Sequence, residues 1–472
     1  MNFVSWAFVA LFAVVLVARL VIGRRKIEPA YVALLVVASV TFYAWHIPVY
    51  IGILVLSSVI DYWAGLALAR LDPAARGRRR AVLTLSLATN LGLLAFFKYA
   101  DFFLEVAHDL LGERAGAPPA ELGLALPMGI SFYTFQSMSY TIDVYRGVLA
   151  PIHRFWPFFL FISFFPQLVA GPIVRAAEFL PQMPRPRRLR RAVVYEGLWL
   201  IVSGFFLKMV CADNLAVYVD EYWERGVQPG ATSAFTLWLA LMFSGQIFAD
   251  FAGYSNIARG TAYLLGYRLP INFNAPYLAA SFKNFWERWH MTLSRWLRDY
   301  LYISLGGNRR GSVRTYVNLM LVMLLGGLWH GAAYTFIIWG ALHGGALAGE
   351  RLLGLHAHRG WGGRWPVRAV WFMVVQALVL TAWVFFRSRR LGDATQFLAN
   401  FSALEGWTLG RMEWVGLLFL APLVTQHAFT WMRERGWVHE PGPATRAILA
   451  AFMVYGIVTL YAGTADFIYF QF

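Results

Sequence analysis

The chain has few charged residues and a single cysteine. Only 14% of its 472 residues are charged and 59% are hydrophobic, whereas a soluble domain usually carries about 25% charged residues. Cys211 lies inside an apolar run, so an intrachain disulfide and a multi-cysteine metal site are both excluded. The composition therefore indicates a polytopic membrane protein rather than a soluble domain.

The sequence also lacks the common short motifs of soluble enzymes. It contains no glycine-rich phosphate loop, no Gly-x-Ser-x-Gly elbow and no His-Glu-x-x-His zinc motif. Its ten histidines are too scattered for the local spacing of a zinc site. We therefore expect neither a metal ion nor a resident cofactor.

Basic residues outnumber acidic ones, and the net charge is +16. They fall in short blocks beside apolar runs, as the positive-inside rule predicts, so the excess does not indicate nucleic-acid binding. The blocks at 24–26, 70–80 and 175–191 alternate with acidic loops, which places them in the cytoplasm. The first apolar segment, 3–22, precedes its basic residues. A signal peptide has the reverse order, so a retained first span is predicted.

The apolar runs predict roughly ten to twelve transmembrane helices, each of about 20 residues. Lipid offers no partners for backbone polar groups, and the runs lack the alternation of a barrel, so helices are expected. The predicted fold class is an all-α polytopic membrane protein with re-entrant or interfacial helices. No repeat or linker divides the chain, so residues 1–472 are expected to form one domain. Spans are predicted at 3–22, 31–45, 49–68, 82–103, 155–174, 193–211, 235–251, 321–344, 367–386, 414–431 and 447–462, with 127–145 either re-entrant or a tilted helix buried in protein.

His330 lies near the middle of the apolar segment Leu321 to Gly344. An ionisable side chain at that depth is costly and usually marks a functional site facing a protein-lined cavity. The alternative is a structural histidine satisfied by a helix–helix hydrogen bond. Function is favoured, because a neutral imidazole can take a proton from an attacking hydroxyl near operating pH.

His290 lies in Ser281 to Arg310, which is predicted to form one amphipathic interfacial helix. His290 extends an apolar stripe made by Trp286, Leu293 and Leu297. It is therefore either a catalytic residue or a polar anchor at the interface.

His343 follows His330 by thirteen residues. On one straight helix the two imidazoles would lie about 20 Å apart along the axis, too far to hold one metal ion or substrate atom. We therefore expect His343 to be a polar residue near the end of its span.

The basic blocks have two interpretations. Most are explained by topology and by anionic lipid. Some could instead form a landing site for an anionic cytosolic substrate, and the candidates for that role are Arg288, Arg295, Arg298, Arg309 and Arg310.

Two segments carry a family resemblance. Phe285 to Arg310 (FWERWHMTLSRWLRDYLYISLGGNRR) and Leu325 to Gly331 (LGGLWHG) resemble the membrane-bound O-acyltransferase family, and in particular its bacterial polysaccharide O-acetylase branch, which includes alginate O-acetyltransferases. Segments starting at Pro127 (PMGISFYTFQSMSYTIDVYRG), Phe164 (FFPQLVAGPIVR) and Phe248 (FADFAGYSNIARG) agree, as does the terminal FIYFQF.

The resemblance implies a helical fold around a funnel or tunnel and an acetyl transfer. Acetyl-CoA would be the cytosolic donor, and acetyl would cross the inner membrane to alginate, cellulose, another exopolysaccharide or peptidoglycan. Expected partners are membrane lipids, a periplasmic SGNH hydrolase-like acetyltransferase and the polysaccharide synthesis machinery. The family's catalytic histidine matches His330 and its second histidine matches His290. Substrate-binding candidates are Trp286, Trp289, Trp329, Arg288, Arg295, Arg298 and Asn308.

A transporter or flippase with a histidine proton relay is the alternative from another class. It would be expected to show internal repeats, paired broken helices and several intramembrane acids. No repeat is found, and the candidate acids are few: Asp61, Asp101, Asp143 and Asp250. A purely structural scaffold is a third possibility, which His330 argues against.

Overall fold

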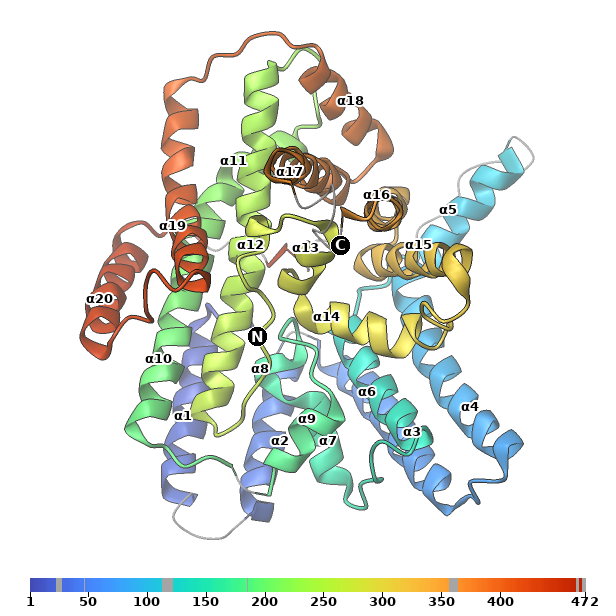
Figure 1. The fold of residues 1–472 in the computed structure, drawn as a ribbon. Helices are drawn as coiled ribbons and strands as arrows, with labels where there is room; N and C mark the ends of the chain where they lie inside the picture. The colour runs from blue at the N-terminus through green and yellow to red at the C-terminus, as the bar shows by residue number, and fades with distance from the viewer. Residues whose placement is uncertain are drawn as a thin grey trace. The chain divides into compact units, whose positions relative to one another are not determined.

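The computed structural model describes residues 1–22, 28–45, 47–112, 122–184, 186–355, 364–463 and 467–468. Within these ranges the chain consists of helices and their connections, without a β-strand (Figure 1). The basic residues 24–26, used above to orient the first span, lie outside the described ranges, as do the last four residues of the terminal motif.

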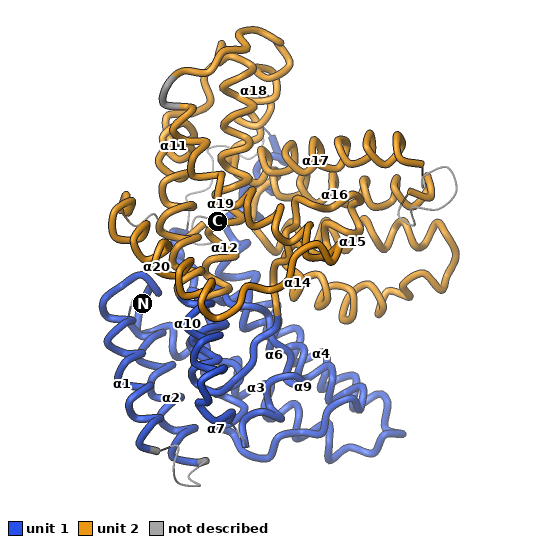
Figure 2. Tube along the Cα trace, turned by 60° about the vertical axis from the view of Figure 1, so that its left-hand side comes forward, with its two compact units in different colours: residues 1–201, 257–270 blue, residues 202–256, 271–472 orange. Residues whose placement is uncertain are grey.

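Contacts along the chain group it into two compact units (Figure 2). Unit 1 contains residues 1–201 and 257–270, and unit 2 contains residues 202–256 and 271–472. Two helices, α10 (Arg191–Phe205) and α12 (Ser233–Leu264), contribute to both. That the whole chain acts as one domain stays a prediction.

The predicted all-α polytopic membrane fold is confirmed. Seven helices in the described part are long and apolar enough to cross a membrane, and three shorter apolar helices accompany them. The long ones are Pro48–Arg70, Arg76–Leu111, Arg191–Glu224, Ser233–Leu264, Gly311–His330, Trp365–Arg387 and Glu413–Glu434, and the short ones are Trp6–Val21, Pro29–Ala44 and Pro443–Thr459.

The helices of unit 1 include one whose character the sequence left open. The segment 127–145 forms α6 (Ile130–Tyr145), and nearly all of its side chains are buried. Its serines, threonines and tyrosines therefore face protein, and it is a buried helix. The other main helices of unit 1 are α1 (Trp6–Ile22), α2 (Glu28–Ala44), α3 (Ile51–Arg70), α4 (Arg76–Leu94), α5 (Ala100–Leu111) and α7 (Phe155–Ser163).

The single span predicted over 155–174 is wrong. Helix α7 ends at Ser163, and Phe164 leaves the helical region with φ −52° and ψ 106°. A four-residue turn of helix, α8 (Phe165–Leu168), then begins with Pro166 in its first turn. Proline suits the start of a new helix because it lacks the N–H that an interior position needs. The side chains of residues 158–174 are buried, so the apolar character of the segment reflects packing against protein.

Asp61 joins three helices of unit 1. Its fully buried carboxylate on α3 accepts hydrogen bonds from the hydroxyls of Ser86 on α4 and of Ser137 on α6. Asn90 Nδ2 donates to Oδ2 at 2.7 Å, and the Thr141 hydroxyl donates to Oδ1 at 2.9 Å. A buried charge is tolerated only when it is hydrogen-bonded or paired, and these four donors provide that. Asp61 is therefore a structural residue.

In unit 2 a buried lysine forms ion pairs with two acidic residues. Lys208 Nζ lies 2.8 Å from Asp213 Oδ1 and 2.9 Å from Asp250 Oδ1. The second oxygen of Asp250 accepts the backbone N–H of Ile468 at 2.7 Å. This acid on α12 thus holds the backbone at Ile468. The main helices of unit 2 besides α12 are α11 (Asp213–Glu224), α13 (Phe282–Arg288), α14 (Met291–Trp296), α15 (Gly311–His330), α16 (Tyr334–Leu352), α17 (Trp365–Arg387), α18 (Leu391–Ser402), α19 (Arg411–Glu434) and α20 (Pro443–Thr459).

The single span predicted over 321–344 is also wrong, because two antiparallel helices meet there. Helix α15 ends at His330, Gly331 is extended, and α16 starts at Tyr334. A Cβ atom at Gly331 would overlap the Phe336 ring, and one at Gly327 would overlap the Phe336 carbonyl oxygen. Glycine at both positions lets the two helices pack in direct contact, so His330 lies at the turn of a hairpin.

We expect Asp61→Ala to lower the free energy of unfolding by about 3 kcal/mol, because four buried donors lose their acceptor. Thermal unfolding of the purified protein in detergent would measure this. Thr84→Ala, which removes an exposed hydroxyl from α4, is the matched control and should leave the transition unchanged. Equal melting of the two variants would contradict a structural role for Asp61.

Candidate active site

The helix predicted over 281–310 is interrupted at His290. Helix α13 is capped by the Ser281 hydroxyl, which accepts the N–H of Asn284 at 3.0 Å, and it ends at Arg288. Trp289 is extended, and His290 has φ 39° and ψ 52°, in the left-handed region. Such a backbone costs roughly 1 kcal/mol for a residue with a Cβ atom and persists only where the surroundings impose it.

Asn272 imposes this turn. Its backbone carbonyl accepts the N–H of Met291 at 2.9 Å. Its side-chain oxygen accepts the Thr292 hydroxyl at 2.8 Å and the Thr292 N–H at 3.3 Å, and it lies 3.1 Å from His290 Nδ1. Its amide nitrogen donates to the Ser255 hydroxyl on α12 at 3.2 Å. The backbone carbonyl and the side chain of Asn272 thus together hold the backbone after His290, and the side chain orients its ring.

These bonds also assign the His290 tautomer. The Thr292 N–H can only donate, so the Asn272 atom facing it must be the oxygen. His290 Nδ1 faces the same oxygen and therefore carries the proton. His290 lies between two short helices outside the membrane-spanning segments, and burial lowers its pKa to about 3. The ring is therefore neutral at physiological pH, with its lone pair on Nε2.

His330 lies beside His290. The centroids of the two rings are 6.3 Å apart, and both side chains are buried. The His330 ring also contacts Trp329, Trp339 and Phe386, with centroid separations of 5.0 Å, 5.0 Å and 5.3 Å. The structure thus brings together two histidines that are forty positions apart in the sequence and surrounds them with aromatic rings.

His343 does not occupy the position predicted for it. The prediction assumed one straight helix shared with His330, but the hairpin returns α16 along α15. His343 is fully buried in the middle of α16, and its ring centroid lies 4.7 Å from Trp339, which itself contacts His330. Phe285 stacks on His343 at 5.8 Å and Trp286 meets it edge-on at 5.1 Å. His343 therefore belongs to the same aromatic cluster as the other two histidines.

The three tryptophans predicted to bind substrate are all buried in this cluster. Trp286 contacts His343, and Trp329 lies 6.1 Å from the His290 centroid. Trp289 is fully buried against Phe273 and Trp383, at 5.0 Å and 4.8 Å. Their position fits an apolar passage, and their contact with substrate stays a prediction.

The polar substrate-binding candidates lie in different settings. Both oxygens of Glu434 accept hydrogen bonds from Arg288 at 2.8 Å, and Arg298 pairs with Asp299 at 2.6 Å. These acids offset part of the positive charge that the sequence suggested for an anionic substrate. Arg295 Nε donates to the Met291 carbonyl at 3.3 Å. Asn308, Arg309 and Arg310 are exposed, as is Arg298.

Several residues of the site were missed by the sequence analysis. Asn272 is one polar residue in a loop, and nothing in the local sequence relates it to His290. Trp339 and Phe386 come from α16 and α17, where aromatic residues in apolar helices are common. Of the features that were missed, the hairpin turn after His330 alone had a signal in the local sequence, namely the glycines around it.

Comparisons with known proteins agree on one family. The model of the membrane-bound O-acyltransferase family matches residues 146–387, which include both histidines and Asn272. The probable alginate O-acetylase AlgI of Azotobacter vinelandii is 39% identical over 398 residues, covering 84% of this chain and 77% of that protein. The peptidoglycan O-acetyltransferase of Helicobacter pylori is 38% identical over 406 residues, covering 80% and 75%. The teichoic acid D-alanyltransferase of Bacillus subtilis is 32% identical over 232 residues, covering 46% and 56%.

We expect Asn272→Ala to reduce acyl transfer by about 10- to 100-fold, because His290 loses the partner that fixes its ring and tautomer. Acyl transfer would be measured in membranes with labelled donor, alongside protein abundance. Asn214→Ala, at a half-buried asparagine on α11, is the control. Normal activity of Asn272→Ala at normal abundance would show that this positioning is not needed.

Proposed function

Because the chain belongs to the membrane-bound O-acyltransferase family, we propose that it moves acetyl from cytosolic acetyl-CoA across the bacterial inner membrane for O-acetylation of an extracytoplasmic polysaccharide. The chain is an O-acyltransferase and a multi-pass membrane protein, as its family and its apolar helices indicate. The observation that best supports the proposed chemistry is the pair of buried imidazoles at 6.3 Å.

In the proposed step His330 acts as the general base. It takes the proton from the acceptor hydroxyl as the oxygen attacks the thioester carbonyl carbon. A carbon–oxygen bond forms, the carbon–sulfur bond breaks, and the departing thiolate receives the proton from the imidazolium. The neutral His290 assists by positioning or proton transfer through Nε2. General-base catalysis of this kind contributes about 10²- to 10⁴-fold in rate.

Burial of both histidines supports transfer rather than hydrolysis. Aromatic rings surround them, and a site that excludes water protects a thioester from attack by water. The phosphates of acetyl-CoA would bind among the basic residues of the segment 281–310, of which Arg298, Arg309 and Arg310 are exposed. The thioester would lie among the aromatic rings around His290 and His330.

The acceptor polymer follows from the relatives only as a class. Those named above act on alginate, peptidoglycan and teichoic acid. We propose an exopolysaccharide such as alginate or cellulose, or peptidoglycan, with a periplasmic SGNH hydrolase-like acetyltransferase and the polymer's synthesis machinery as partners. A transporter is disfavoured, because Asp61 and Asp250 are engaged in structural hydrogen bonds and ion pairs in the described part of the chain.

We expect His330→Ala to abolish polymer acetylation, a loss of at least about 100-fold, because the base is removed. The acetate content of the exported polymer would be measured together with the abundance of the protein in membranes. His439→Ala, at an exposed histidine, should acetylate normally. Full acetylation by His330→Ala would rule out the catalytic assignment, and loss of the protein from membranes would call for His330→Gln instead.

We expect the blocks 70–80 and 175–191 and the segment 281–310 to face the cytoplasm, from the alternation of basic and acidic loops. A single cysteine placed by Arg188→Cys in a Cys211→Ala background would be tested with a membrane-impermeant thiol reagent. It should react only after the inner membrane is opened. Labelling from the periplasmic side in intact cells would overturn the proposed orientation.

A further inference from the structure

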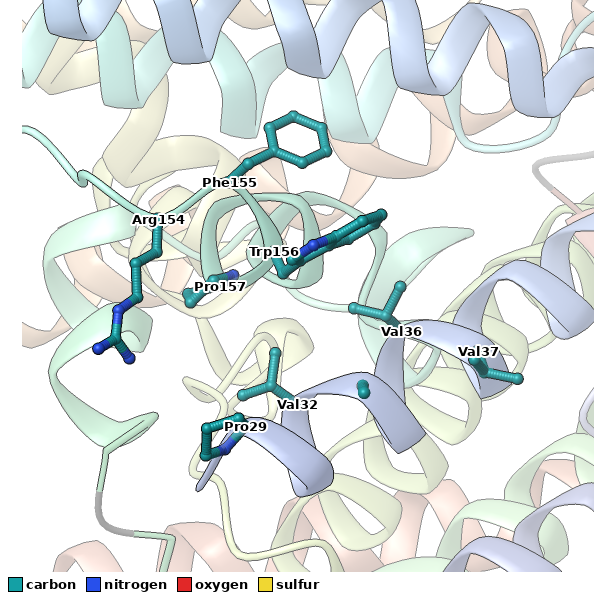
Figure 3. Close-up of a pocket in the computed structure, with 9 residues that line it drawn as sticks. Pro29, Val32, Val36, Val37, Arg154, Phe155, Trp156 and Pro157 are labelled. Carbon is teal, nitrogen blue, oxygen red and sulfur yellow. The ribbon is translucent and has the colours of Figure 1, made fainter. Parts of the chain in front are cut away.

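Unit 1 contains a pocket that the acetyl-transfer proposal does not use. It has a volume of about 560 Å³ and lies between the first half of α2 and the start of α7 (Figure 3). That volume falls in the range of roughly 300–1,000 Å³ typical of sites for small ligands. The pocket is therefore large enough for part of a lipid molecule.

The walls of the pocket are apolar. Val32 and Val36 of α2 face Trp156 and its neighbours across it, and Val37 also lines the pocket (Figure 3). Val37 and Trp156 are 64% and 61% exposed. Exposed apolar side chains on a membrane protein meet lipid chains, and tryptophan is enriched where chains meet headgroups. The walls therefore suit an acyl chain.

One end of the pocket carries a positive charge. Arg154 is exposed and lies at the end near Pro29 (Figure 3). Among the residues that the structure describes, the ion pairs do not include Arg154. A guanidinium can bind a phosphate through two parallel hydrogen bonds. The charge and the apolar walls together match a phospholipid, with its phosphate at one end and its chain along the valines.

The pocket lies at the basic end of unit 1. Arg79 donates to the Tyr145 carbonyl at 2.9 Å, and the Tyr62 hydroxyl donates to the His153 carbonyl at 2.8 Å. The first bond ties the end of α6 to the block 70–80, and the second ties the loop before α7 to α3. That block is predicted to be cytoplasmic, and the cytoplasmic surface of a membrane attracts basic residues through its anionic lipids.

We propose that this pocket binds an anionic phospholipid of the cytoplasmic leaflet, with the phosphate at Arg154 and an acyl chain against Val32, Val36 and Trp156. The site is independent of the acetyl-transfer chemistry. It would hold the loop before α7 against α2, because one ligand contacts both segments.

Native mass spectrometry of the full-length protein in detergent, with added phosphatidylglycerol, would test the site. We expect one phosphatidylglycerol to be retained by the wild type, and a five- to tenfold weaker retention by Arg154→Gln, about the effect of one phosphate contact. Ala33→Trp, which fills the pocket from an exposed position on α2, should abolish retention. Arg146→Gln, exposed in the same loop and outside the pocket, is the matched control.

Thermal unfolding in detergent solution provides a second measurement, which is independent of mass spectrometry. Phosphatidylglycerol should raise the melting temperature of the wild type and of Arg146→Gln, but not that of Ala33→Trp. Equal retention and equal stabilisation in all four proteins would overturn the proposal. Equal binding of phosphatidylcholine and phosphatidylglycerol by the wild type would also overturn it, since Arg154 would then select no charge.

Discussion

The turn at His290 is the constraint on which the site depends. The left-handed backbone at His290 separates α13 from α14, and the side chains of Trp289 and His290 are both fully buried at this turn. The Asn272 backbone carbonyl accepts the N–H of Met291. The Asn272 side-chain oxygen accepts the Thr292 hydroxyl and sets the His290 tautomer. Asn272 therefore determines both the backbone conformation at His290 and which nitrogen of its ring carries the proton.

Much of the fold could be predicted from the sequence, because long apolar runs indicate helices that can cross a membrane. The positions at which the helices break could not be predicted. The segments 155–174 and 321–344 are apolar throughout, and an apolar run is equally compatible with a straight crossing and with a buried turn. Tertiary packing decides between the two. Phe164 leaves the helical region inside a packed core, and Gly331 has no side chain, which leaves room for the Phe336 ring.

His330 was predicted from its position in an apolar run, and the family resemblance pointed to both His330 and His290, but their shared surroundings were not predicted. Asn272 reaches His290 only through the fold, across eighteen positions of the chain. His343 was misplaced because a distance along a straight helix was applied to a hairpin, where Trp339 contacts both His330 and His343. Arg288 shows the opposite case. Its charge is evident in the sequence, but its pairing with Glu434, 146 positions away, is not.

The hairpin of α15 and α16 also changes the direction of the chain. A straight helix over 321–344 would end far from its start, whereas in the hairpin Gly344 of α16 packs against Met320 of α15. Arg309 and Arg310 before α15 and Arg351 at the end of α16 then share one side, as basic flanks favour. The chain therefore continues after α16 from the end of the hairpin at which α15 began. One extended glycine, Gly331, thus sets the point from which the last quarter of the chain continues.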